Sequence, residues 1–255
     1  FEKAGSYRDK IVALTQIQSQ QNINLQGIKD TDVISISRQG SKSCVQVFIY
    51  RSGQNWGNRS FFPKHSDEEE TSEILERFIV DFYTKHTPPK NVLINKNLKD
   101  QELITNSLQS IYRFRTSFVV PKQGKKLDIV TYAEKNSDLS LQGHITQSMN
   151  NKQTLQTLQS VLKIKKEIKK IEAYDNSHLF GKNAVGAMVV FSEEGFNKKA
   201  YRKFNINQNE VKSSDDYGMM SHVLNRRFSK EAINDKKKHN NLPEVILIDG
   251  GKGHY

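Results

Sequence analysis

The sequence is poor in cysteine and proline and has no long apolar run. Of its 255 residues, 1 is cysteine and 5 are proline. A single cysteine excludes a disulfide framework and a zinc site built from cysteines. It is also typical of a reducing compartment, so we expect a cytoplasmic protein. No apolar run approaches the roughly 18 residues that a membrane span needs. The chain begins with Phe1 and has no signal-peptide pattern, from which we expect a fragment of a longer protein.

Acidic residues are the scarcer charged class. There are 28 Asp and Glu against 39 Lys and Arg, which gives a net charge of +11 and an isoelectric point near 9.5. This balance predicts a polyanionic partner, although charge alone favours nucleic acid only weakly. The hydrophobic content of 35% is low but regularly patterned, which argues against a disordered chain.

The first 20 residues have a helical pattern, and a polar linker follows. Apolar side chains recur at three- and four-residue steps, namely Phe1, Ala4, Tyr7, Ile11, Leu14 and Ile17. Residues 21–31 are rich in Gln and Asn, which is typical of a linker.

Residues 32–121 predict an α/β domain of order βββαβαβ. Strands are expected at 33–36, 45–50, 55–62, 91–95 and 116–120, with helices opening after the acidic run 66–70 and near Leu98. Pro88-Pro89 ends the first helix. Residues 122–165 then predict a basic helical connector with two helical stretches, at 124–141 and 153–162.

Residues 166–255 repeat the beginning of this order. Strands are expected at 168–175, 184–191 and 199–206, a helix at 215–228 and a fourth strand at 245–249. Three antiparallel strands, a crossover helix and a fourth strand beside the first form an RNase H-like sheet. We therefore predict a mixed α/β fold with two RNase H-like units, the second truncated after its fourth strand.

Acidic residues fall where two neighbouring strands of the second unit would end. Asp175 ends its first strand and Asp249 its fourth, and parallel neighbours would bring both acids to one edge. Asp215 and Asp216 start the helix between them. Such a cluster is costly to desolvate unless cations occupy it. Two Mg²⁺ or Mn²⁺ ions about 3.5–4 Å apart would compensate the charge and activate water against a phosphodiester.

Simpler interpretations exist for each of these residues. A strand-end Asp is more often a turn or cap residue, and Asp215 is most simply a helix N-cap. The Gly-Gly-Lys-Gly after Asp249 lacks the spacing of a phosphate loop, which argues against an NTPase. His178 could lie behind the metal ligands, contact a phosphate or be an ordinary surface residue.

Three basic clusters are candidates for phosphate contacts with salt-sensitive binding. Their members are Lys163, Lys165, Lys166, Lys169 and Lys170; Arg226, Arg227 and Lys230; and Lys122, Lys125 and Lys126. Each could equally be a solvated face or a complement to a helix dipole. Lys252 is a better candidate because it follows the strand of Asp249 directly. Trp56 and Cys44 are expected in the core or on the sheet surface.

Five ordered blocks of this sequence resemble the UvrC family, the nuclease subunit of bacterial nucleotide excision repair. They are Phe1-Glu2-Lys3-Ala4 with Tyr7-Arg8-Asp9, Tyr174-Asp175-Asn176-Ser177-His178, Ala187–Phe191 with Tyr201–Ile206, Asp215-Asp216-Tyr217 with Leu224–Phe228, and Ile246–Gly253. Ser214 departs from the family, which usually has Gly there.

The resemblance implies a metal-dependent endonuclease that cuts damaged DNA 5′ to the lesion. Asp175, Asp216 and Asp249 would be its catalytic and metal-binding carboxylates. The first block resembles the latter half of a UVR motif, so Phe1, Ala4, Tyr7 and Arg8 are expected to bind UvrB. A downstream catalytic His of the family would lie beyond Tyr255, so the fragment itself could be inactive.

The first unit is expected to be degenerate. Asn95 ends its fourth strand where the second unit has Asp249, and the first strand offers no acid in the place of Asp175. We expect a scaffold that holds no metal. Two alternatives to the nuclease remain: a non-catalytic fragment that binds DNA or UvrB, and an RNase H-like resolvase or transposase. The UVR-like helix argues against the latter.

Overall fold

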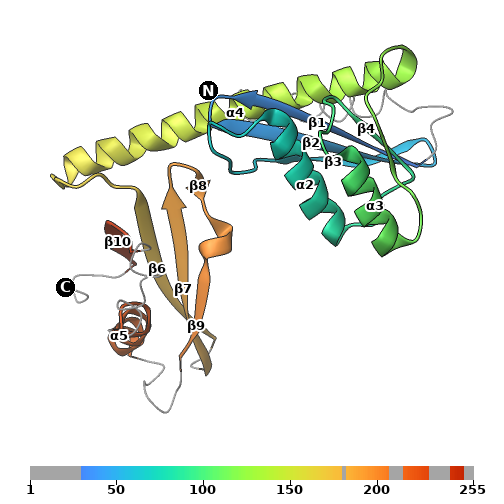
Figure 1. The fold of residues 1–255 in the computed structure, drawn as a ribbon. Helices are drawn as coiled ribbons and strands as arrows, with labels where there is room; N and C mark the ends of the chain where they lie inside the picture. The colour runs from blue at the N-terminus through green and yellow to red at the C-terminus, as the bar shows by residue number, and fades with distance from the viewer. Residues whose placement is uncertain (1–29, 180–181, 207–214, 230–241, 250–255) are drawn as a thin grey trace, which may run out of the picture. The chain divides into compact units, whose positions relative to one another are not determined.

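The computed structural model describes residues 30–179, 182–206, 215–229 and 242–249, coloured along the chain in Figure 1. It divides into two compact units, one up to His144 and one from Ile145. The segment predicted as a UVR helix and linker lies almost wholly outside the described residues. Within the described ranges, no helix combines the length and the apolar character needed to cross a bilayer.

The first unit is built on a five-stranded mixed sheet. Its strands are β1 (Thr31–Gln39), β2 (Lys42–Arg51), β3 (Gln54–Phe61), β4 (Asn91–Ile94) and β5 (Ser117–Val119). They lie in the order β3-β2-β1-β4-β5, with β1, β2 and β3 antiparallel and β4 and β5 parallel to β1. Left-handed backbone at Gly40 and at Ser52-Gly53 makes the two hairpin turns. The predicted order βββαβαβ is confirmed.

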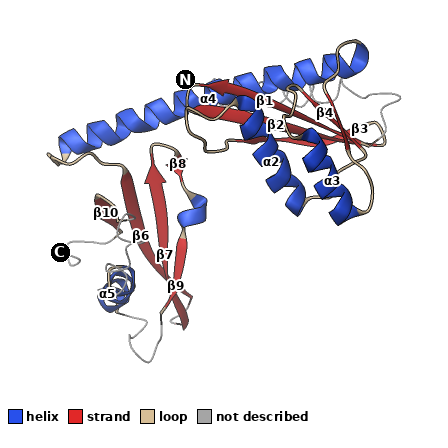
Figure 2. Cartoon of the chain, viewed as in Figure 1, coloured by secondary structure: helices blue, strands red, loops and turns tan. Residues whose placement is uncertain are grey.

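Helices cover both faces of this sheet (Figure 2). Alternate residues of β1 point to opposite faces, so Ile34 and Ile36 pack with helices α2 (Thr71–Lys85) and α3 (Gln101–Tyr112). Val33 instead packs with Ile129 and Ala133 of α4 (Gly124–Val161). Cys44 is buried, and Trp56 is 73% exposed on β3, as expected for core and sheet-surface positions.

Helix α4 corrects the prediction of two separate helical stretches in a connector. It runs without a break through residues 142–152, which are mostly polar but contain no proline. Its first half packs in the first unit, and its second half contributes Leu155 and Leu158 to a cluster with Ile171 and Val245 in the second. Each half is therefore retained as helix by burial against a sheet.

The second unit has the same strand plan. Its strands are β6 (Lys170–Leu179), β7 (Lys182–Ser192), β8 (Gly195–Phe196), β9 (Arg202–Asn205) and β10 (Val245–Ile248). The sheet order is β10-β6-β7-β8, with β9 also on β7 and β10 parallel to β6. One difference is that the third strand, expected at 199–206, is shorter: the 3₁₀ helix η1 (Lys198–Ala200) takes its start, β9 forms the rest, and the two-residue β8 precedes it.

Helix α5 (Asp216–Arg227) covers one face of this second sheet. Met219, Met220 and Val223 pack against Tyr174 and Met188 there. The close approach requires Gly186 on β7, because a Cβ at that position would overlap with the Val223 methyl group. The sequence therefore supplies both the apolar face of α5 and, at Gly186, the position without a side chain against which Val223 packs.

Candidate active site

Asp175 and Asp249 lie side by side at the carboxyl edge of the second sheet. Strands β6 and β10 are parallel, with Tyr174 opposite Ile248, so the next residues on the two strands are the two acids. The Asp249 amide donates a hydrogen bond to the Tyr174 carbonyl over 3.0 Å, which continues the pairing to this point. Alternation puts both side chains on the face of Ile171 and Val245. Both acids are exposed.

Asp216 reaches the same edge from the other face of the sheet. It is the first residue of α5, and its backbone carbonyl lies 3.5 Å from the side-chain amide nitrogen of Asn176, the residue after Asp175. Asp215 is the N-cap, since its carboxylate accepts a hydrogen bond from the Gly218 amide over 2.9 Å. The prediction that Asp215 is the cap is confirmed. The Asp216 carboxylate is exposed and is not used for capping the helix.

The three acids share an edge but do not form a closed cage. Among the described residues, no three His, Cys, Asp or Glu side chains are grouped closely enough to hold a metal ion. The oxygens of Asp175 and Asp249 are nevertheless the donor type that Mg²⁺ and Mn²⁺ prefer. The buried Oδ1 of Asn176 also has no hydrogen-bond partner in the described part of the chain. The donor chemistry fits a divalent cation.

A buried ion pair ties α5 to β6. Arg227 donates two hydrogen bonds to Glu172, from Nε over 3.1 Å and from Nη2 over 2.7 Å, and Tyr174 donates to the same carboxylate over 2.6 Å. Burial raises the pKa of Glu172, but hydrogen bonds from Arg227 and Tyr174 and the Arg227 charge outweigh it and hold the pKa below its usual range. Glu172 is therefore ionised at neutral pH.

Arg227 does not fit the phosphate-contact role predicted for it. Its side chain is only 5% exposed, and its guanidinium is engaged by Glu172. The run Arg226-Arg227 in the sequence hides this difference, because consecutive helix residues point about 100° apart, which turns the Arg227 guanidinium into the core and leaves that of Arg226 outside. Arg226 is exposed and donates to the Asn205 carbonyl over 2.9 Å.

The lysines before β6 remain on the surface. Lys165 is exposed, Lys166 lies 3.2 Å from Glu244, and Lys169 lies 3.6 Å from Glu167. Glu244 also accepts hydrogen bonds from the Lys169 and Lys170 amides, so this cluster partly serves to start the strand. Lys252, Phe1, Ala4, Tyr7 and Arg8 lie outside the described residues, and nothing is described of the His178 side chain.

At the corresponding edge of the first unit, the strand-end side chains are used in contacts within the fold. Ile34 pairs with Ile94, so Ser35 and Asn95 occupy the register positions of Asp175 and Asp249. The Asn95 side chain accepts from the Ile36 amide over 2.9 Å and donates to the Ile36 carbonyl over 3.0 Å. It also donates to Glu134 of α4 over 2.9 Å. Ser35 is fully buried. This edge therefore lacks the acids and is covered by a helix.

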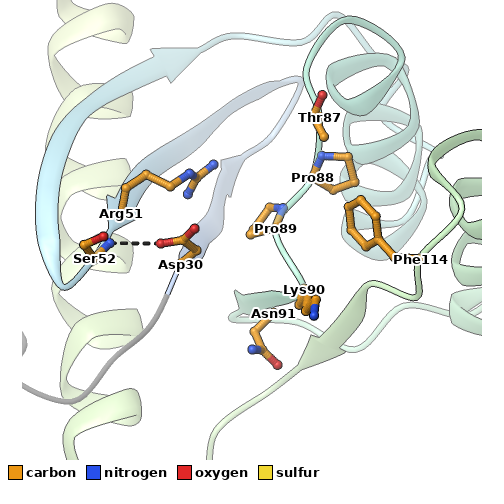
Figure 3. Close-up of a pocket in the computed structure, with 9 residues that line it drawn as sticks. All are labelled: Asp30, Arg51, Ser52, Thr87, Pro88, Pro89, Lys90, Asn91 and Phe114. Carbon is orange, nitrogen blue, oxygen red and sulfur yellow. Dashed lines mark hydrogen bonds between the residues drawn. The ribbon is translucent and has the colours of Figure 1, made fainter.

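A pocket of about 610 Å³ lies at the opposite edge of the first sheet (Figure 3). Arg51, Phe114 and Pro88-Pro89 line it, and the Ser52 amide donates to Asp30 across its rim over 2.9 Å. Arg51 is held by the buried Asp32 over 2.7 Å. The pocket contains none of the residues at the carboxylate edge, so it is separate from the candidate active site.

Sequence reasoning missed Glu172, Asn176 and Gly186. The available signal was Glu172, which stands between the apolar residues Ile171 and Ala173 of a predicted strand, two positions before Tyr174. A buried acid in a strand requires a cation on the facing element, and Arg227 is the cation that the structure supplies. Nothing in the sequence identified which arginine that would be.

Two mixed sheets that share the arrangement of their first strands define the class, which is tandem RNase H-like domains, and the second sheet has paired acids at its carboxyl edge. A family model described as the UvrC ribonuclease H-like domain matches residues 30–144, and one described as the UvrC RNase H endonuclease domain matches residues 159–255. The chain belongs to the UvrC family.

The curated relatives are longer than this chain. It is 42% identical over 99% of its residues to UvrABC system protein C of Hyphomonas neptunium, and 39% identical to that of Ruegeria sp.. It covers 41% and 40% of their respective lengths. Matches to solved structures are remote: Ciona intestinalis endonuclease V is 11% identical over 52% of this chain and 69% of that chain, with a TM-score of 0.26.

Proposed function

We propose that the second unit is the metal-dependent DNA endonuclease of a UvrABC-type repair nuclease, which hydrolyses a phosphodiester 5′ to a lesion. The single observation that carries this proposal is the in-register pair Asp175 and Asp249 at an exposed sheet edge. Relatives named UvrABC system protein C support the repair context. In that context damaged duplex DNA is the substrate, UvrB is a partner through residues 1–20, and the cytoplasm is the location.

Each acid has a separate task in this proposal. Asp175 and Asp249 would hold Mg²⁺ or Mn²⁺ between neighbouring strands, and Asp216 would complete the ligands from the start of α5. The cation supplies Lewis-acid stabilisation of the phosphodiester and a water of lowered pKa. The pairing of β6 with β10 sets Asp175 beside Asp249, and the Glu172–Arg227 ion pair holds α5 against β6.

The first unit would act as a scaffold that takes no metal. Asn95 uses its amide for hydrogen bonds within the fold, and Ser35 replaces an acid in the buried strand. Neither position offers a carboxylate to a cation, so incision should depend on the second unit alone.

A non-catalytic DNA- or UvrB-binding role is the second candidate. It is favoured by the lack of a metal-competent group of three side chains among the described residues. A resolvase- or transposase-type nuclease receives no such support, since both matching family models are from UvrC.

Substitution of the acids in the full-length protein separates these functions. We expect Asp175→Asn, Asp216→Asn and Asp249→Asn each to lower 5′ incision of lesion-bearing duplex by more than the about 10–100-fold typical of residues behind the metal ligands. Asp215→Asn is the matched control, because Asn caps a helix as well as Asp does. Wild-type incision by the Asp175 or Asp249 variant would refute the proposed catalytic site.

A further inference from the structure

A β-bulge on β3, the edge strand of the first sheet, carries the one tryptophan of the chain. Two consecutive residues of β2, Ile49 and Tyr50, lie opposite Gly57 and Asn55 of β3. Trp56 is therefore the extra residue of the bulge. The Gly57 amide donates to the Asn55 side chain over 2.8 Å, which fixes the backbone there. Trp56 is 73% exposed, whereas tryptophan side chains are highly buried on average. The bulge thus directs an indole ring towards solvent.

Trp56 borders a small pocket between β3 and the C-terminal end of α2. The pocket has a volume of about 220 Å³, and its lining includes Arg59 on β3 together with Phe82 and His86 near the end of α2. All of its lining residues fall within residues 30–144, which the structure describes without a gap. The volume lies below the ~300–1,000 Å³ of sites for drug-sized ligands, so the pocket suits a single ring rather than a whole cofactor.

The positive charge in this lining has no acidic counterpart. None of the lining residues is acidic, and Arg59 lines the same pocket as the indole. Arg59 is exposed, and within the described ranges its guanidinium forms no ion pair. The guanidinium carbon lies 6.0 Å from the centroid of the Phe61 ring, a contact that uses none of its N–H groups. An aromatic face beside a cation with unused donors is complementary to a base and its phosphate.

An added peptide strand is another usual occupant of a sheet edge, and the bulge argues against it. Strand addition requires a regular row of free backbone groups along the edge. A bulge interrupts that row and increases the local twist, and natural edge strands use bulges to prevent such pairing. Recognition at this edge therefore depends on side chains, namely Trp56 and Arg59.

We propose that Trp56 and Arg59 bind single-stranded DNA, with one unpaired base stacked on the indole and a neighbouring phosphate bound by the guanidinium. Every base offers a π face to an aromatic side chain, so the contact requires no particular sequence. The inference rests on the proposed function only for the choice of DNA as the nucleic acid. The first unit then contributes to DNA binding, while the chemistry remains with the second unit.

The test uses the fluorescence of Trp56, which reports on this site alone because the chain has one tryptophan. The full chain is titrated, without divalent metal, with an oligo(dT) of about 12 nucleotides, a length within the usual range of single-strand binding sites. We expect saturable quenching of the indole by the single strand. A blunt duplex of equal length should not quench it, because its bases are already stacked inside the helix.

Two variants with matched controls separate the two contacts. Arg59→Gln should weaken the quenching titration about 5-fold and reduce the slope of log affinity against log salt by about 0.7, the contribution of one phosphate in a single strand. Arg115→Gln, at an exposed arginine of the same unit, is the control for loss of charge. Trp56→Ala should bind fluorescein-labelled oligo(dT) about 10-fold more weakly, as measured by anisotropy. Leu139→Ala is its control, because Leu139 is also 73% exposed.

The outcomes separate this site from the proposed catalysis. Quenching is measured without metal, so quenching that depends on Arg59 supports the site even if Asp175→Asn leaves incision unchanged. A titration without quenching overturns the inference, whether or not labelled oligo(dT) binds elsewhere on the chain. Quenching that the duplex reproduces, or that Arg59→Gln leaves the same as Arg115→Gln does, overturns it as well.

Discussion

Arg227 at the last turn of α5 and Glu172 on β6 form a buried, two-point ion pair with oxygen–nitrogen distances of 2.7 and 3.1 Å. This pair joins the helix that begins with Asp216 to the strand that contains Asp175. At the other end of the helix, the Asn176 side chain reaches the Asp216 carbonyl. The third acid is thus held to the sheet by contacts at both ends of α5.

Removal of one partner from this pair should destabilise the second unit. Arg227→Met leaves the Glu172 carboxylate buried without its main partner, and we expect a loss of about 3–5 kcal/mol in the free energy of unfolding. Arg226→Met, on the exposed side of the same turn, should cost much less. Hydrogen exchange resolved by peptide would measure the loss in β6 and α5. Equal effects of the two variants would contradict the structural role of Arg227.

Glu172 should also make the stability of the second unit depend on pH. Its folded pKa lies below the unfolded value of 4.5, so the unfolded chain binds more protons in that range. The stabilisation is present above pH 4.5 and is lost as the pH falls through the folded pKa. Urea unfolding of Glu172→Gln should show a flatter decline in acid than the wild type. Burial raises the pKa of Glu244, but hydrogen bonds from the Lys170 and Lys169 amides and from Lys166 outweigh it and lower the pKa. The Glu172→Gln variant should therefore retain part of the pH dependence of unfolding through Glu244.

Gly186→Ala tests the close approach of α5 to the sheet. The new methyl group would overlap with Val223, so we expect a loss of about 1–3 kcal/mol in stability and a displaced Asp216. Gly143→Ala is the control, since a Cβ there meets nothing within 4 Å and Ala is about 1 kcal/mol better than Gly inside a helix. Val223→Ala should partly restore stability in the Gly186→Ala background, as measured by thermal unfolding. If Val223→Ala does not restore stability, the loss in Gly186→Ala does not come from overlap with Val223.

Asn95→Asp tests whether the first unit can regain an acid. The substitution replaces the amide that donates to the Ile36 carbonyl and to Glu134, and it sets two carboxylates together. We expect a loss of about 1–3 kcal/mol at neutral pH, smaller in acid where the new carboxyl is protonated. Isothermal titration with Mn²⁺ should detect no site in the first unit. Asn97→Asp, an exposed neighbour, should leave stability nearly unchanged.

The order of the elements and the edge of the site follow from local patterns. Alternating apolar residues in β1 and β2, the turns at Gly40 and Gly53, and the acids that follow β6 and β10 could all be identified in the sequence. Periodicity and turn chemistry depend on residues close together in the chain, so they can be recognised in a single sequence. The roles of Asp215 as a cap and of Asn95 at the strand end were predictable for the same reason.

Only the tertiary structure decided which charges are buried and what they touch. The sequence treats Arg226 and Arg227 alike, yet one is exposed and the other pairs with Glu172, 55 residues away. It suggests a break within α4, which instead stays helical because each half is buried against a sheet. Asn95 meets Glu134 across 39 residues, and this contact closes the first unit. These outcomes depend on desolvation and packing between distant segments, which no local pattern encodes.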